Sequence, residues 1–335
     1  MKKINPAKAA IALFTIIVMI VAICFAFSLG ARDSDLAKTA KSADRTVYNV
    51  LLLGKDDAAG LSDVIILASI NAQSGDVNIL QIPRDTYFNY TDASYKKING
   101  APNALTNAGF ASALSDALGV EIDFYFEIKL STLKKIVDAI SGVDVNVPMD
   151  MDYEDPTQGL SIHLKKGSNH LLGDEALSFI RFRSGYITGD IGRLDAQKIF
   201  LNAFIKRIGE QKNPIILLNI LKLVLAESDT NIGEQNLISL GMKGSKNHGG
   251  TTRYITAPGE AVQSEESGAW YYILSSSSMA EILREFFGVA DEKSFDKDYK
   301  FVDKRVKSFY DIYNKHYDYK IYSAHEIEDE QININ

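Results

Sequence analysis

The stretch that decides the fold spans residues 48–85 and reads YNVLLLGKDDAAGLSDVIILASINAQSGDVNILQIPRD. It contains three short apolar runs, at 49–53, 64–70 and 77–82, which are rich in Val, Ile and Leu. Gly, Asp, Ser or Asn residues bound each run. This pattern is typical of strands that are buried inside a sheet. The sequence therefore predicts three strands at the start of a folded domain.

Charged side chains gather where these strands begin or end. Asp56 and Asp57 follow the first strand, Asp63 precedes the second, and Arg84 and Asp85 follow the third. Neighbouring strands lie about 5 Å apart, so residues at adjacent strand ends can converge. Two carboxylates and an Arg at one sheet edge would bind a divalent cation and an anionic oxygen compound.

The two candidate metal-binding carboxylates are Asp56 and Asp63. An Asp at a strand end is most often a turn or cap residue, which is the alternative for each of them alone. Magnesium prefers one or two carboxylates together with phosphate oxygens and water. Asp57 could replace Asp56 in this role, and the sequence does not separate the two.

Composition limits the possible classes of protein. The chain has 335 residues, of which 46% are apolar, enough for one large domain or two modest ones. The net charge of −7 argues against a nucleic-acid-binding protein, which would carry a basic stripe. Cys24 is the single cysteine, so no internal disulfide is possible.

The N-terminus predicts a membrane anchor. Residues 9–30 carry no charge and follow a short segment with three lysines. About twenty apolar residues span a bilayer as a helix, whereas the apolar core of a cleaved signal peptide has only about 7–15. The lysines are expected to keep residues 1–8 in the cytoplasm, so the chain after Arg32 should lie outside the cell membrane.

A single α/β domain is expected after this anchor. Residues 31–46 are small and polar and are predicted to be a linker. Strand and helix patterns alternate from 47 to 289 without an internal repeat, which predicts an α/β sandwich with a largely buried sheet. Residues 290–335 form a charged and aromatic tail with no function evident from the sequence.

Hydrophobic spacing and cap residues predict the remaining elements. Helices are expected at 104–118, 131–140, 173–180, 190–208, 215–225, 234–242 and 277–287. Strands are expected at 123–130, 143–147, 162–164 and 254–257. The acidic stretch 150–159 is expected to be a loop.

Arg84 follows Pro83 at the exit of the third strand. Pro fixes its own backbone angle and cannot continue the hydrogen-bond ladder, so it should project the Arg from a rigid point. The alternative is a purely structural ion pair of Arg84 and Asp85 with a neighbouring group.

Arg181 and Arg183 alternate with Phe182. In an extended segment both guanidinium groups would point to the same side. Two such groups repel unless an anion lies between them, and Arg binds phosphate through two parallel hydrogen bonds. The alternative is a solvated basic patch.

Arg193 and Gln197 are four residues apart on the helix expected at 190–208, so they share one face. Arg193 also lies near the start of that helix, where backbone N–H groups favour an anion. Lys97, in the segment KKIN, carries no distinctive signal alone.

Together these segments resemble the LytR-CpsA-Psr family of membrane-anchored cell-wall proteins of Gram-positive bacteria. The resemblance covers about residues 47–289. The motifs that carry it are NVLLLGKD, LSDVIILASIN, VNILQIPRDTY, KKING, FYFEIKLSTLKKIVDAISGVDVNVP, MDYEDPTQGLSIHLKKG, LLGDEALSFIRFRSG and GDIGRLDAQKIFL.

The resemblance implies an α/β/α fold with a mixed central sheet and a pocket for a polyprenyl-phosphate lipid. The implied activity moves a glycopolymer, of the teichoic acid or capsular polysaccharide type, from a polyprenyl-pyrophosphate carrier to peptidoglycan. Magnesium (Mg2+) on the pyrophosphate is the implied cofactor. The implied location is the cell membrane, with one span, the N-terminus in the cytoplasm and the catalytic domain outside.

The resemblance also assigns roles to the candidate residues. Asp56 and Asp63 correspond to the magnesium-side carboxylates, and Asp85 corresponds to the acidic partner in a Pro-Arg-Asp motif. The set implied to contact pyrophosphate is Arg84, Lys97, Arg181, Arg183, Arg193 and Gln197. Of all these residues, the implied catalytic ones are Arg84, Asp85 and Arg181.

Some positions depart from the family pattern. Leu61 and Ala196 stand where this family often has Arg, and the loop between Asp56 and Asp63 is shorter than usual. The chain thus keeps the core set with fewer cations. Two alternative functions remain at this point: a non-catalytic envelope regulator or wall-binding scaffold, and a lipid-pyrophosphate hydrolase.

Overall fold

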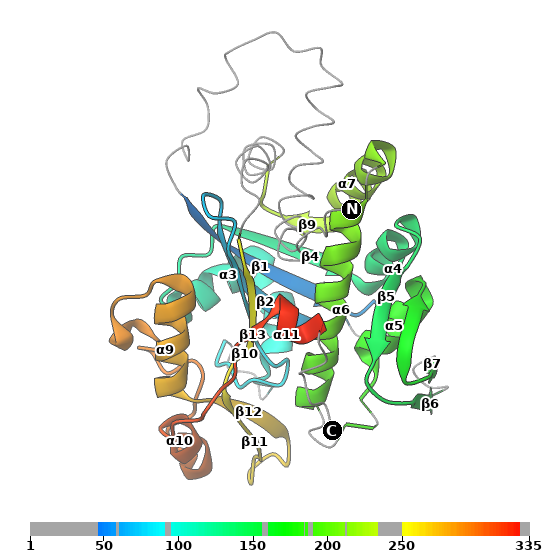
Figure 1. Ribbon diagram of the computed structural model, residues 1–335. Coiled ribbons are helices and arrows are strands. Elements are labelled where there is room, and N and C mark those ends of the chain that lie inside the picture. The colour runs from blue at the N-terminus through cyan, green and yellow to red at the C-terminus, as the bar shows by residue number, and fades with distance from the viewer. Residues whose placement is uncertain are drawn as a thin grey trace, which may run out of the picture.

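Three layers make up the folded body, with one large sheet between two sets of helices (Figure 1). The computed structural model describes residues 46–57, 60–90, 95–155, 160–183, 185–186, 190–211, 213–233 and 250–328. The predicted anchor at 9–30 and the predicted helix at 234–242 lie outside these residues. None of the described helices combines the length and the hydropathy that a membrane span requires.

The central sheet has seven strands in the order β13-β10-β3-β2-β1-β4-β9. Their bounds are β1 Val47–Lys55, β2 Ser62–Asn71, β3 Val77–Gln81, β4 Phe124–Lys129, β9 Ser228–Thr230, β10 Thr252–Thr256 and β13 Tyr322–Ser323. β1 pairs antiparallel with β2 and parallel with β4. β3 pairs antiparallel with β2 and parallel with β10. The predicted α/β fold with a mixed sheet is therefore confirmed.

This pairing determines where strand ends meet. β1, β3, β4 and β10 run in one direction, and β2 runs in the other. The ends of β1, β3, β4 and β10 therefore lie along one edge of the sheet, together with the start of β2. We call this edge the site edge.

Alternation along the strands sends side chains into two separate cores. On β1, Val50 packs on one side and Leu51 on the other. On β2, Ile66 and Ile65 divide in the same way. Because both faces of the sheet are covered, these strands read as continuous apolar runs.

One face of the sheet is covered by α4, α5, α6, α7 and α11 (Figure 1). Their bounds are α4 Leu130–Ala139, α5 Gly173–Arg181, α6 Asp190–Glu210, α7 Pro214–Glu227 and α11 Ala324–Glu328. Asn213 caps α7 by accepting the N–H of Ile215, and Pro214 occupies the first turn, where its missing N–H costs nothing.

The other face is covered by α3, α9, α10 and a hairpin of β11 and β12 (Figure 1). Their bounds are α3 Ala101–Leu118, α9 Ser276–Phe287, α10 Lys307–Tyr313, β11 Gly259–Gln263 and β12 Trp270–Leu274. Two single turns, η2 Ile98–Gly100 and η3 Glu292–Ser294, flank them. Gly119, with φ +66°, ends α3 as the sequence predicted.

Most predicted elements are present with bounds shifted by a few residues, but one prediction is wrong. Residues 150–159 were expected to be a loop, yet β6 Met151–Asp155 pairs with β7 Leu160–Leu164. Met151 is buried, whereas Asp152 and Glu154 point outward and pair with His163. The acidic residues hide the alternation of a strand. A second small pair joins β5 Val143–Val147 to β8 Gly167–Leu171.

The segment after residue 289 packs onto the same body. β13 pairs antiparallel with β10, which places Tyr322 opposite Tyr254. Phe301 and Phe309 are buried in the core beneath α9 and α10. Residues 290–328, all of which the structure describes, therefore belong to the same folded body as the strands and helices before them.

Candidate active site

Charged residues from three strand ends meet at the site edge. Asp63 lies at the start of β2, and Arg84 follows β3, which is its neighbour in the sheet. Arg84 Nη1 donates to Asp63 Oδ1 at 2.6 Å. The predicted convergence of these two side chains is therefore confirmed.

A tight turn fixes the backbone of Arg84. The N–H of Thr86 donates to the carbonyl of Pro83 at 3.0 Å, so Arg84 and Asp85 occupy the centre of the turn. The N–H of Asn99 donates to the Arg84 carbonyl at 3.2 Å. On the other side, the N–H of Tyr272 donates to the Asp85 carbonyl at 2.9 Å. The guanidinium of Arg84 therefore extends from a backbone held from both sides.

Lys97 joins the same cluster. Its Nζ lies 2.9 Å from Asp85 Oδ1, and Arg84 Nε lies 4.0 Å from that oxygen. The backbone of Lys97 is held by a β-bridge to Tyr87. Lys97, Asp85, Arg84 and Asp63 thus form a row of alternating charges.

The two remaining arginines of the cluster come from the end of α5. Arg181 Nη2 lies 3.3 Å from Asp56 Oδ2, and Arg183 Nη2 lies 3.9 Å from Asp63 Oδ2. Arg181 is the last residue of α5, so the segment is not extended throughout. The extended backbone begins at Phe182, which has φ −60° and ψ 136° and is buried. Both guanidinium groups nevertheless reach the cluster.

Asp56 and Asp57 point to different partners. Asp57 accepts from the backbone N–H and the hydroxyl of Ser131, at 2.9 and 2.8 Å, and so holds the first turn of α4. Asp56 instead faces Arg181. The N–H of Asp56 also donates to the Leu61 carbonyl at 2.9 Å, which closes the short loop before β2. Of the two carboxylates, the structure brings Asp56 to the cluster.

α6 packs beside this cluster and carries Arg193 and Gln197. Arg193 lies in the first turns of α6 and is 1% exposed. Gln197 Nε2 donates to the carbonyl of Ile180 at 3.3 Å, directly before Arg181. Within the described part of the chain, Gln197 Oε1 is buried without a hydrogen-bond partner. Gln197 therefore ties α6 to the helix that presents Arg181.

Two residues near the cluster were not predicted from the sequence. Gln81, the last residue of β3, is 1% exposed and donates from Nε2 to the Leu194 carbonyl of α6 at 3.3 Å. The Tyr95 hydroxyl donates to Asn99 Oδ1 at 2.9 Å. Burial raises the pKa of Tyr95, and the charges of Asp85 and Asp63 raise this pKa further. Gln81 is a polar residue within the apolar run predicted at 77–82, which is a signal for a buried polar contact, whereas Tyr95 belongs to no repeating pattern.

The charges of the cluster favour an anion. Four cationic side chains face three carboxylates, and Arg193 adds a further positive charge nearby. The side chains of Arg84, Lys97 and Arg181 are between 18% and 27% exposed, so a ligand can reach them. The site can therefore bind an oxyanion through several fixed donors.

Asp56 and Asp63 are the carboxylates that could hold a metal here. Among the described residues, no group of three or more His, Cys, Asp or Glu side chains has the arrangement of a metal site. Magnesium commonly takes one or two carboxylates and completes its shell with phosphate oxygens and water. Two carboxylates beside a cluster of cationic side chains that could bind phosphate fit that mode of binding.

One departure from the family pattern has a visible structural setting. Ala196 is fully buried in the core on the α6 side of the sheet. This position therefore adds no charge to the cluster, whose cations are Arg84, Lys97, Arg181 and Arg183.

Comparison with known proteins identifies the family of this chain. The model of the LytR_cpsA_psr family matches residues 28–287. Polyisoprenyl-teichoic acid–peptidoglycan teichoic acid transferase TagU of Bacillus mycoides (strain KBAB4) is 30% identical over 259 residues, which cover 76% of this chain and 82% of TagU. The transferase of the same type, TagV of Bacillus subtilis (strain 168), is 31% identical over 208 residues, covering 59% of this chain and 53% of TagV.

Solved structures match as well. The crystal structure of B. subtilis TagV superimposes with a TM-score of 0.60 at 26% identity, covering 73% of this chain and 99% of TagV. A structure of TagT bound to LIIa-WTA has a TM-score of 0.57 at 23% identity, over 77% of this chain and 94% of TagT, which shows a shared fold. Because the family model spans most of the sequence, this chain belongs to the LytR_cpsA_psr family.

Proposed function

We propose that this chain transfers a glycopolymer of the teichoic acid type from a polyprenyl-pyrophosphate carrier to peptidoglycan. The names of the relatives TagU and TagV describe such a transfer for those proteins. The observation that carries the proposal is the meeting of Arg84, Lys97 and Arg181 at one sheet edge, although they are far apart in the sequence.

The negative charge that develops in this reaction would lie on phosphate oxygens bound by this cluster. A sugar hydroxyl of the acceptor attacks the phosphorus that carries the glycan, a new oxygen–phosphorus bond forms, and the hydroxyl proton is lost to the departing phosphate or to water. The bond from that phosphorus to the bridging oxygen breaks, and polyprenyl phosphate leaves with the electron pair. Negative charge grows on the phosphate oxygens, and fixed guanidinium groups stabilise it because they need no reorganisation.

The proposal assigns roles to the residues of the cluster. Arg84 and Arg181 bind the phosphate oxygens and stabilise the charge that develops on them. Asp85 holds Lys97 and Arg84 in place through its carboxylate. Arg183, which is 43% exposed, binds the outer part of the diphosphate.

Magnesium belongs to the same proposal. Asp56 and Asp63 would hold the ion, which would neutralise phosphate oxygens of the diphosphate. Asp63 lies 2.6 Å from Arg84 and Asp56 lies 3.3 Å from Arg181, so both carboxylates stand beside the arginines that would bind the phosphates.

The lipid and the location complete the proposal. The core between the sheet and α4, α5 and α6 is apolar and lies directly beside Arg181, as the buried Phe179 and Phe182 show. We place the polyprenyl chain on this side. Residues 9–30 would anchor the protein in the cell membrane, with the catalytic domain at the outer face.

The test is a transfer assay with the purified full chain, Mg2+, a labelled lipid-pyrophosphate-linked glycan and peptidoglycan fragments. We expect labelled peptidoglycan from the wild type and from Arg305→Ala, an exposed Arg that pairs with Asp303 and with none of the cluster's carboxylates. Arg84→Ala and Arg181→Ala should lose transfer while they keep the wild-type melting temperature. Full transfer by both of these variants would refute the proposed site.

Two further outcomes separate the alternatives. Release of free glycan without any acceptor would indicate a hydrolase. A reporter fused after Asn335 tests the location, and a cytoplasmic signal would contradict the proposed topology.

A further inference from the structure

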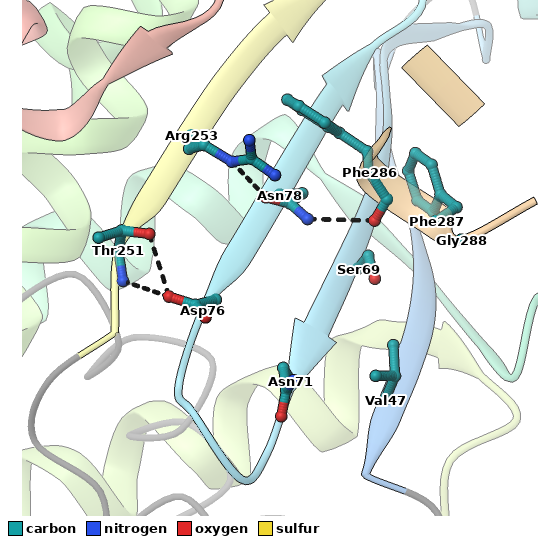
Figure 2. Close-up of a pocket in the computed structure, with 10 residues that line it drawn as sticks. All are labelled: Val47, Ser69, Asn71, Asp76, Asn78, Thr251, Arg253, Phe286, Phe287 and Gly288. Carbon is teal, nitrogen blue, oxygen red and sulfur yellow. Dashed lines mark hydrogen bonds between the residues drawn. The ribbon is translucent and has the colours of Figure 1, made fainter. Parts of the chain in front are cut away.

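A pocket lies at the opposite end of the strands from the candidate active site. Figure 2 shows it at the starts of β1, β3 and β10, beneath the C-terminal end of α9. Its volume is about 450 Å³. The lining residues are Val47, Ser69, Asn71, Asp76, Asn78, Thr251, Arg253, Phe286, Phe287 and Gly288. We call it the distal pocket. β1 rises by about 3.3 Å per residue, so roughly 25 Å separates the distal pocket from Asp56.

The side chains on one face of the sheet change from apolar to polar where the distal pocket begins. Under α9 and α3 the same face of the sheet is apolar, with Leu67 and Leu80 fully buried. Nearer the pocket, one row of directly paired residues crosses four neighbouring strands and is polar throughout. The row consists of Asn49, Ser69, Asn78 and Arg253. A covered sheet face normally buries apolar side chains, so this polar row needs partners.

Hydrogen bonds make the walls of the distal pocket rigid (Figure 2). Arg253 Nε donates to Asn78 Oδ1 at 2.9 Å, and Asn78 Nδ2 donates to the Phe286 carbonyl at 3.1 Å. The backbone N–H of Thr251 donates to Asp76 Oδ1 at 2.8 Å. A site whose walls are already fixed does not pay an ordering cost on binding.

The charges at this pocket are already balanced within the protein. Arg253 Nη1 pairs with Glu285 at 2.5 Å, and its guanidinium lies over the ring of Phe286. Asp76 accepts from the Ser74 hydroxyl and from Thr251. The pocket therefore offers neither an excess cation for a phosphate nor an open carboxylate group for a metal, and it suits a neutral ligand.

Two polar groups remain available to that ligand. Ser69 is 4% exposed, and its hydroxyl makes no hydrogen bond with another described residue. Asn71 accepts from the N–H groups of Gln73 and Ser74 through Oδ1, and its amide nitrogen donates to none of the described residues. A hydroxyl that donates and accepts, and an amide that donates, match the hydroxyl and acetamido groups of a sugar. Val47 and Phe287 supply the apolar side of the pocket.

We propose that the distal pocket binds a neutral N-acetylhexosamine unit of a glycan strand. Its volume falls in the usual range of small-molecule sites, roughly 300–1,000 Å³. A phosphate-rich polymer would find no unbalanced cation there, so the strand bound is the uncharged glycan backbone of the acceptor. This assignment of the strand rests on the proposed function. The pocket then holds the acceptor strand at one end of the sheet while the phosphate is transferred at the other.

The test is titration of the full chain with the disaccharide di-N-acetylchitobiose, followed by calorimetry or by ligand-detected NMR. Ser69→Ala removes the available hydroxyl. Asn71→Asp removes the amide donor but keeps the oxygen that accepts from residues 73 and 74. Loss of one hydrogen bond to a neutral ligand should weaken binding by about five- to tenfold for each variant. Gln73→Ala, an exposed change in the same turn, should bind as the wild type does.

The opposite site provides the second arm of the experiment. Arg84→Ala should bind the disaccharide normally although its rate of glycan transfer is strongly reduced. Failure of wild-type transfer with normal disaccharide binding would refute the proposed function and support the pocket. Absence of binding by the wild type, equal binding by Ser69→Ala and Asn71→Asp, or displacement of the disaccharide by inorganic phosphate would each overturn the proposal.

Discussion

Arg84 Nη1 lies 2.6 Å from Asp63 Oδ1, although Arg84 follows Asp63 by 21 residues and the chain reverses direction between β2 and β3. The contact arises because β2 begins at the edge where β3 ends. Both partners are only partly exposed, at 18% and 14% of their side chains. Arg84 is thus positioned by one carboxylate and by a hydrogen-bonded turn.

Arg84→Ala should reduce the transfer rate by about 10²–10³, the usual cost of removing one donor from a developing oxyanion. Arg84→Lys should restore only part of this loss, because an ammonium group cannot form two parallel bonds to phosphate. Initial rates of glycan transfer measure both effects, with Arg305→Ala as the matched control. Equal rates for the Lys variant and the wild type would show that point charge alone suffices.

Substitutions of Asp56 and Asp57 should have different effects. Asp57→Ala removes the bonds to Ser131 at the start of α4, so it should lower the free energy of unfolding by about 1 kcal/mol and leave transfer intact. Asp56→Asn should weaken the Mg2+ dependence of transfer with little change in stability. Denaturant unfolding and a Mg2+ titration of the transfer rate measure the two effects. If instead Asp57→Ala weakened the Mg2+ dependence and Asp56→Asn did not, Asp57 would be the metal-side carboxylate.

Gln81→Met tests whether the tie between β3 and α6 matters for catalysis. Met has a similar size, but it cannot donate to the Leu194 carbonyl, so Arg193 would be less firmly placed relative to Arg84. Small displacements of a substrate-positioning group are costly, and we expect kcat to fall by about tenfold with KM nearly unchanged. Gln263→Met, at an exposed Gln that donates to the Gly268 carbonyl, is the control. A rate equal to that of the wild type would show that the tie is only structural.

His170 should make stability depend on pH. A hydrogen bond to Asp144 is the main cause that raises the pKa of His170 above its ordinary value of 6.5. The folded state therefore holds the proton more tightly than the unfolded state. The stabilisation is fully present below about pH 6.5 and is lost as pH rises through the raised pKa.

Asp144→Asn should flatten this part of the pH profile of unfolding free energy. The effect should be small, because the His170 side chain is 49% exposed and solvent screens the pair. His163 also has a raised pKa, through its bonds to Glu154 and Asp152, so His163→Gln serves as a comparison variant. An unchanged slope in Asp144→Asn would contradict the assignment.

Much of the fold was predictable because β1 to β3 are buried on both faces and therefore read as apolar runs. The meeting of Asp63 and Arg84 followed from the spacing of strand ends. The choice between Asp56 and Asp57 did not, because it depends on the path of a short loop and on contact with α4. β6 was missed because its outward residues are acidic and mask the alternation.

Other features depend on tertiary contacts that no local pattern encodes. Gln81 gains its role only because α6 packs over the end of β3. Tyr95 approaches the cluster through a loop without periodicity. The distal pocket arises from side chains on four strands that become neighbours only in the folded sheet.

The short strand β13 has a consequence for shortened forms of the protein. It pairs with the outer side of β10 through Tyr322 and Ser323. A truncation before Tyr322 would leave that margin of the sheet as an open ladder of amide and carbonyl groups. An unpaired sheet edge can pair with another chain, so such a fragment is expected to self-associate and precipitate more readily than the full chain.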